Sequence, residues 1–216
     1  MAAASADCPC RARRWLRIGA LAASLILLAG CDLSALGVSR DREDGPRRDD
    51  PYQKALQYKQ DSECDRAIPL LEPLADRGHG FEVAQYQLGT CYLERARNDS
   101  SPERAANLRK NAAEWLLKAA NSGDPGAQEQ AIRLYADGTG VGADAVEAAK
   151  WFIILESNPL RRLYGPLILD ADLEQALRQK LGDSGWAEAR ARAKEWRPVE
   201  QPLTLPQGPE PPRRRR

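Results

Sequence analysis

The chain has a single histidine among its 216 residues. A nucleophile of the Ser-His-Asp or Cys-His kind would therefore have to be built around His79. That residue lies in Arg77-Gly78-His79-Gly80, where the two glycines predict a turn between helices. We interpret His79 as part of this turn and not as a catalytic base.

Motifs that are typical of catalytic and cofactor sites are also missing. The chain has no glycine-rich phosphate loop, no Gly-x-Ser-x-Gly elbow, no Cys-x-x-Cys pair and no paired spacing of metal ligands. We therefore predict that the protein is not an enzyme and that it holds neither a cofactor nor a metal. A hydrolase that uses His79 is the less favoured alternative.

Charge of one sign does not predominate. The 32 Lys and Arg residues against 31 Asp and Glu residues give a formal net charge of +1, and the longest run of positive charge is the terminal Arg213 to Arg216. A broad basic face of the kind that binds nucleic acid is not expected. The arginine run either contacts anionic lipid headgroups or is an inert tail.

One apolar run stands out near the start of the chain. Ile18 to Ala29 follows several arginines and is too short to cross a bilayer as a helix, so it is typical of a signal peptide. It ends in Leu28-Ala29-Gly30-Cys31, which resembles the lipobox of bacterial lipoproteins. The resemblance implies a signal peptide of residues 1–30 and a diacylglycerol anchor with palmitate-type chains on Cys31. The alternative is a secreted protein in which Cys31 carries no lipid.

The residue after Cys31 bears on the location of the protein. Asp32 resembles the signal that keeps lipoproteins of enteric bacteria in the inner membrane. We therefore expect a lipid-anchored protein that faces the periplasm, with the inner membrane favoured and the outer membrane possible.

Two cysteines remain after the signal peptide and Cys31 are set aside. Cys64 and Cys91 would lie in an oxidising compartment, where a pair favours a disulfide. The midpoint between them falls at Arg77-Gly78, the predicted turn of a helical hairpin, so antiparallel helices would bring the two positions to the same height. Two separate buried thiols are the alternative.

Apolar residues recur at three- and four-residue spacing after Pro51, which predicts amphipathic helices. The segments also resemble each other. Ala67 to Gly78 aligns with Ala112 to Gly123 at an offset of 45, Ala112 to Trp115 recurs at Ala148 to Trp151 at an offset of 36, and Ala84-Gln85 recurs as Ala127-Gln128 at 43. Periods of this size predict an all-α fold, a short α-solenoid of antiparallel helix pairs.

The third unit carries a family resemblance. Leu134 to Trp151 contains Tyr135, Gly138, Gly140-Val141, Asp144, Ala148 and Trp151 at spacings that resemble the Sel-one-like repeat, a relative of the tetratricopeptide repeat. Here Gly138 and Gly140 end the first helix in conformations that favour glycine, and Asp144 caps the second. In the preceding unit a longer polar insertion, Arg97 to Asn107, replaces this turn.

The expected organisation has five parts. They are a lipoprotein signal peptide (1–30), a disordered tether (31–50), Sel-one-like helical repeats (51–158), a cap of two helices over Ala171–Leu181 and Ser184–Arg197 (159–197), and a disordered tail rich in Pro and Arg (198–216).

In related repeats the first helix of each unit lines a concave groove. The resemblance therefore implies a groove that binds a partner and is formed by Tyr86, Thr90, Glu94, Glu129 and Arg133. The expected function is a membrane-anchored periplasmic scaffold that binds an unidentified envelope protein or peptide. The alternative is a structural subunit of an exopolysaccharide or secretion assembly.

Overall fold

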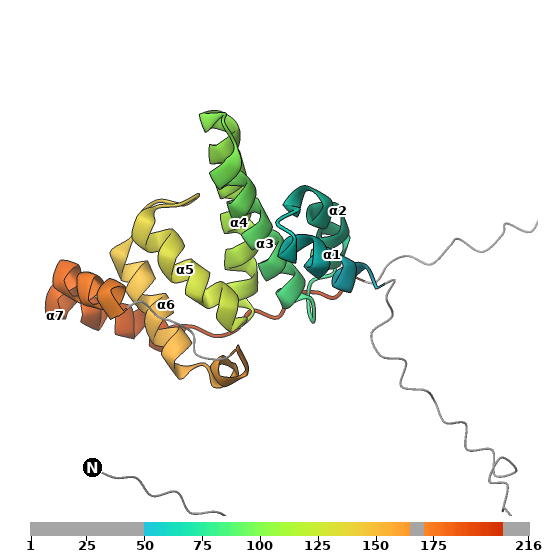
Figure 1. The fold of residues 1–216 in the computed structure, drawn as a ribbon. Helices are drawn as coiled ribbons and strands as arrows, with labels where there is room; N and C mark the ends of the chain where they lie inside the picture. Colours follow the sequence, from blue (N-terminus) through green and yellow to red (C-terminus); the bar gives the residue numbers. More distant parts are fainter. Residues whose placement is uncertain (1–49, 165–170, 205–216) are drawn as a thin grey trace, which may run out of the picture. The chain divides into compact units, whose positions relative to one another are not determined.

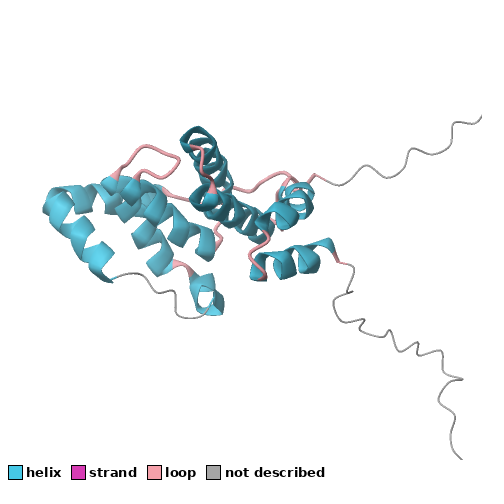
Figure 2. Cartoon of the chain, turned by 45° about the horizontal axis from the view of Figure 1, so that its top comes forward, coloured by secondary structure: helices cyan, strands magenta, loops and turns pink. Residues whose placement is uncertain are grey.

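The computed structural model describes residues 50–164 and 171–204. The described residues form helices and connecting segments, with no strand among them (Figures 1 and 2). None of the helices in these two ranges is long and apolar enough to cross a membrane. In chain order the elements are α1 (Pro51–Gln60), α2 (Cys64–Ala75), α3 (Glu82–Asn98), α4 (Pro102–Asn121), α5 (Pro125–Asp137), α6 (Ala145–Ser157), the short 3-10 helix η2 (Pro159–Tyr164) and α7 (Ala171–Glu195).

Three helices begin in the same way, with a capping side chain followed by proline. Asp50, Ser101 and Asp124 are the N-caps of α1, α4 and α5, and each side chain accepts a hydrogen bond from a backbone N–H in the first turn. The next residue is proline in each case, which suits the first helical position because no N–H partner is needed there. The sequence itself therefore specifies where these helices begin.

Consecutive helices pack against each other along the chain, as pairs α1 with α2, α3 with α4, and α5 with α6. Each pair also packs on the next through α2 with α3 and α4 with α5. This nearest-neighbour packing is the arrangement of an α-solenoid, so the predicted fold class is confirmed.

Alanine dominates the contacts between helices. Ala112, Ala119, Ala120, Ala127, Ala131 and Ala148 are all fully buried. Small side chains let helix backbones approach closely, and larger residues fill the space between them. Trp151, Leu88 and Leu116 are the large partners, each at most 1 % exposed.

The turn between α5 and α6 follows the prediction. Gly138 and Gly140 adopt positive φ angles of 73° and 74°, and the Asp144 side chain accepts hydrogen bonds from the N–H groups of Val146 and Glu147 at 2.9 and 3.0 Å. Gly140 also lies against the backbone carbonyl of Arg109, where a β-carbon would collide. Glycine is thus required at position 140 for both conformation and space.

The predicted polar insertion between α3 and α4 is different in the structure. Most of the segment from Arg97 to Asn107 is helical, because α3 continues to Asn98 and α4 already begins at Pro102. The Ser101-Pro102 pair starts α4 early, and Arg104 pairs with Asp99 across the short connection at 3.1 Å. The extra residues lengthen two helices (Figure 1) instead of forming a loop.

The C-terminal cap consists of two helical stretches joined at a break. α7 spans Ala171–Glu195, but Gly182 inside it has non-helical angles (φ 59°, ψ −170°), so the division predicted near this point is present. The cap packs on α6 through two edge-to-face aromatic pairs, Phe152 with Trp186 at 6.1 Å and Trp151 with Trp196 at 5.9 Å between ring centroids. These contacts cover the apolar face of the last repeat, as a terminal cap must.

Candidate interaction surface

The predicted groove residues lie on two first helices of neighbouring pairs. Tyr86, Thr90 and Glu94 follow each other at four-residue spacing on α3, and Glu129 and Arg133 do the same on α5. Residues four apart share one helix face. On α5 the two residues form an ion pair with an N–O distance of 3.6 Å.

Contacts near the start of α5 connect the two helices. The Tyr86 ring lies against Gly126, where a β-carbon would be 3.1 Å from the ring. Burial raises the pKa of Tyr86, and the negative charges of Asp124 and Glu129 raise it further. The predicted residues of α3 and α5 thus come near each other at Tyr86, which is partly buried and helps to join the two repeats.

A residue that sequence reasoning missed completes the α3 part of this surface. Lys59, at the end of α1, donates hydrogen bonds from Nζ to Thr90 Oγ1 at 2.7 Å and to Gln87 Oε1. The same ammonium lies 5.5 Å from the centroid of the Tyr86 ring. Lys59 is therefore held in one position by three side chains of α3, and α1 contributes a cation to the face predicted from α3 and α5 alone.

Burial of Lys59 lowers its pKa from 10.5 to about 8, while the carboxylate of Glu94 opposes this shift. We expect an NMR titration of the lysine side chains to show a midpoint near pH 8 for Lys59. The Glu94→Gln variant should move this midpoint lower, because the attraction that favours the charged form is removed.

The same shift has a consequence for stability with a defined sign. Between about pH 8 and 10.5 the unfolded chain binds a proton at Lys59 that the folded chain has released, so the free energy of unfolding contributed by this residue rises with pH in that window. A Lys59→Met variant should lack this rise, so the difference in the free energy of unfolding between wild type and variant should change between about pH 8 and 10.5. A difference that stays constant over this window would contradict the partly buried position of Lys59.

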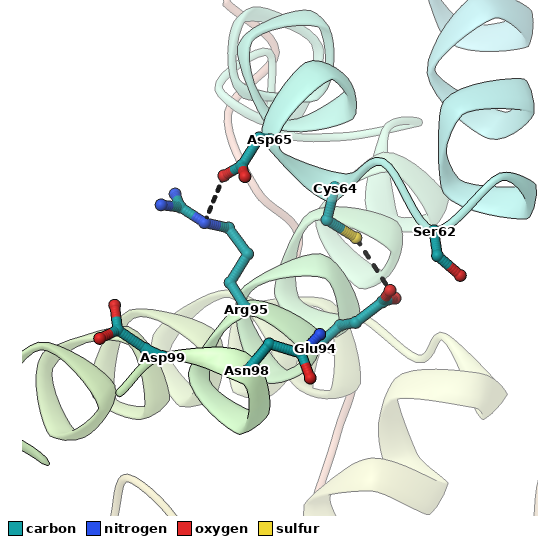
Figure 3. A pocket seen from close by; sticks show the side chains of 7 residues that line it. All are labelled: Ser62, Cys64, Asp65, Glu94, Arg95, Asn98 and Asp99. Atoms are coloured by element: carbon teal, nitrogen blue, oxygen red, sulfur yellow. Dashed lines mark hydrogen bonds and ion pairs between the residues drawn. The ribbon is translucent and has the colours of Figure 1, made fainter. Parts of the chain in front are cut away.

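Glu94 adjoins the cysteine pair. The structure joins Cys64 and Cys91 in a disulfide with Cα atoms 5.2 Å apart, and Glu94 Oε2 lies 3.4 Å from the Cys64 sulfur (Figure 3). Since a disulfide sulfur carries no proton, this is a contact in the oxidised form and becomes a hydrogen bond only if the thiol is regenerated. The disulfide links the start of α2 to the middle of α3.

A polar pocket of about 180 Å³ opens beside this disulfide. It is lined by Ser62, Cys64, Asp65, Glu94, Arg95, Asn98 and Asp99, and Arg95 pairs with Asp65 at 2.6 Å across it (Figure 3). Within residues 50–164 and 171–204 no group of three or more His, Cys, Asp or Glu side chains is arranged to hold a metal ion. His79 lies in the turn before α3, with Nδ1 3.6 Å from Glu82 Oε1.

Some predicted features lie outside the described residues. These are the expected signal peptide (1–30), the expected tether up to residue 49 with Cys31, its expected lipid and Asp32, and the expected tail from residue 205 onward with the arginines at positions 213–216.

Comparisons with known proteins support the fold. No family model and no curated protein matches the chain. Among solved structures it is similar to the crystal structure of a protective antigen present in uropathogenic Escherichia coli strains, which displays an SLR fold. The two are 23% identical with a TM-score of 0.53, over 68% of this chain and 29% of the other. The match thus covers less than a third of the other chain. It supports the Sel-one-like repeat (SLR) fold, which the motif in Leu134 to Trp151 predicted.

Proposed function

We propose that this protein is a helical-repeat scaffold, anchored by a lipid on Cys31 to a membrane of the bacterial envelope, which binds another protein through the face of α1, α3 and α5. The observation that carries the proposal is the position of Lys59, whose ammonium is held by Thr90 and Gln87 on the same face as the predicted groove residues. Polar side chains that are already ordered lose less conformational entropy when a partner binds.

The charges of this face indicate the kind of partner. Lys59 and Arg133 are cations, while Glu94 and Glu129 are anions, so a partner segment with charges of both signs complements it. The Tyr86 ring adds an aromatic anchor between them. A partner helix or an extended peptide that carries both charges fits this surface.

The proposed location rests on the sequence and on the cysteine pair. The lipobox-like segment ending at Cys31 supports lipid anchorage, and a disulfide between Cys64 and Cys91 is typical of the periplasm and rare in the cytosol. Asp32 favours the inner membrane.

A crosslinking pull-down from membranes tests this function. Tagged wild-type protein is expected to capture a specific partner that the Arg133→Glu variant captures at least about tenfold less, since like charge across an interface is costly. Arg190→Glu is the control for the change of charge, because Arg190 is exposed and lies on α7, whereas Arg133 is partly buried on α5. A partner captured equally by both variants would contradict the proposed face. Mass spectrometry of the mature protein tests the anchor, and a Cys31 that carries no acyl chain would contradict it.

A further inference from the structure

The first residues of the predicted disordered tail follow a defined path in the structure. Residues 198–204 are extended and run back from α7 past the ends of α4 and α3 (Figure 1, orange-red). The N–H of Val199 donates to the carbonyl of Asn121 at 2.7 Å, and the N–H of Thr204 donates to the carbonyl of Arg77 at 2.8 Å. This part of the tail is thus bound along the turns that join one helix pair to the next.

Gln201 is the residue of this segment that reaches inside. Its side chain and that of Gln85 form a reciprocal amide pair, with Gln85 Nε2 donating to Gln201 Oε1 at 2.8 Å and Gln201 Nε2 donating to Gln85 Oε1 at 3.0 Å. Gln85 is fully buried and also donates to the carbonyl of Ala75. A buried amide needs partners for both its donor and its acceptor, and Gln201 supplies one of each.

We call the place where one helix pair joins the next a junction: Gln85 lies at the junction of α2 and α3, and Gln128 lies at the junction of α4 and α5. The second junction shows the same arrangement of the glutamine without a tail residue. Gln128, the repeat equivalent of Gln85, is also fully buried and donates to the carbonyl of Ala120. There Asn158, at the end of α6, donates to Gln128 Oε1 at 2.8 Å. At the offset of 36 residues the position of Asn158 corresponds to Ser122, whose shorter side chain instead accepts a hydrogen bond from Gln201 Nε2 at 2.5 Å. At the Gln85 junction the short side chain of Ser122 therefore leaves room for an amide side chain from another segment, and Gln201 occupies this space.

The tail is held at the Gln85 junction mostly by hydrogen bonds. Val199 and Leu203 are 56 % and 52 % exposed, so the segment buries few apolar side chains. Gly78 allows close approach, because a β-carbon there would collide with the carbonyl of Pro202. Apolar burial therefore contributes little free energy to holding the segment, so a competing segment that makes the same hydrogen bonds can displace it.

We infer that the surface formed by Arg77, Gly78, Gln85, Asn121 and Ser122 is a binding site for an extended, glutamine-containing segment of a partner protein, and that residues 199–204 occupy it when the partner is absent. Gln85 forms hydrogen bonds with the glutamine side chain of the bound segment. The carbonyls of Arg77 and Asn121 accept hydrogen bonds from its backbone N–H groups. We name this surface the junction site. It shares no residue with the face of α1, α3 and α5, so it does not depend on the proposed function.

Binding of a fluorescent peptide to the full-length protein tests this inference. The probe has the sequence of residues 198–204, and its matched control has alanine in place of the glutamine. Because the tail competes with the probe, the Gln201→Ala protein should bind the probe about tenfold more tightly than wild type does. The control peptide should bind neither protein. The Arg133→Glu variant should bind the probe as wild type does, which separates this site from the proposed partner face.

Two results would overturn the inference. One is that the Gln201→Ala protein fails to bind the probe, and the other is that it binds both peptides equally. The Gln201→Ala substitution removes hydrogen-bond partners of buried Gln85 but leaves Gln85 itself in place, so circular dichroism checks that the variant is folded. The matched substitution is made in the peptide alone.

Discussion

Replacement of Trp151 by alanine is expected to lower the free energy of unfolding by about 3 to 5 kcal/mol, the usual cost of removing a buried aromatic side chain. Trp151 is 1 % exposed and lies in the apolar cluster that joins α4, α5, α6 and α7. Its ring also forms an edge-to-face pair with Trp196 in the cap. Alanine would leave a cavity where the last repeat, its neighbour and the cap meet.

The Trp151→Phe variant is the control. Phenylalanine keeps most of the volume and removes an indole N–H that has no hydrogen-bond partner among the described residues. Its cost should stay below about 1.5 kcal/mol, as for other substitutions that nearly conserve volume. Urea unfolding of the unlipidated Cys31→Ser protein measures the stability of both variants. Equal unfolding midpoints for Trp151→Ala and wild type would show that stability does not depend on the packing around Trp151.

The double variant Cys64→Ala/Cys91→Ala is expected to lose about 3 to 4 kcal/mol of stability. The bond closes a loop of 27 residues, and the chain-entropy relation gives this value for a loop of that length. Both cysteines are at most 3 % exposed, and they join α2 to α3. Without the bond, α1 and α2 are held to the remaining repeats by packing and by polar contacts such as Lys59 with Thr90 and Arg95 with Asp65.

Unfolding with and without a reducing agent provides the matched comparison. Reduction should lower the unfolding midpoint of the wild type but leave the double variant unchanged. The loss on reduction should be somewhat smaller than the loss in the variant, because the Cys64 thiol gains a hydrogen bond to Glu94 and no sulfur atoms are removed. A wild type that is insensitive to complete reduction would contradict a stabilising bond.

Features encoded by local chemistry could be predicted from the sequence. Gly138, Asp144 and the break at Gly182 act through the backbone of their own segment, so composition and spacing reveal them. The repeat offsets located the helix pairs because each unit buries the same small residues. In contrast, Arg97 to Asn107 reads as a polar insertion in place of the turn, but polar residues are equally normal on exposed helix faces, and most of this segment is helical.

Apart from the Cys64–Cys91 disulfide, which the predicted helical hairpin indicated, contacts between distant segments could not be predicted. Lys59 joins the candidate face because of how α1 packs beside α3, and no local pattern marks it. The junction site depends on the shortness of Ser122 compared with Asn158, and on a tail residue 79 positions further along the chain. Equivalence between repeats located Gln85 and Gln128. Only the structure shows that Gln201 forms hydrogen bonds with Gln85 and that Asn158 forms one with Gln128.

The most direct test of the scaffold proposal is photo-crosslinking in cells from single positions of the lipidated protein. A crosslinking amino acid at Thr90, on the face of α1, α3 and α5, should capture one specific envelope protein. The same amino acid at Arg190, exposed on α7, should not. Capture of the same protein from position 190 but not from position 90, or of no protein from position 90, would contradict a scaffold that binds through this face.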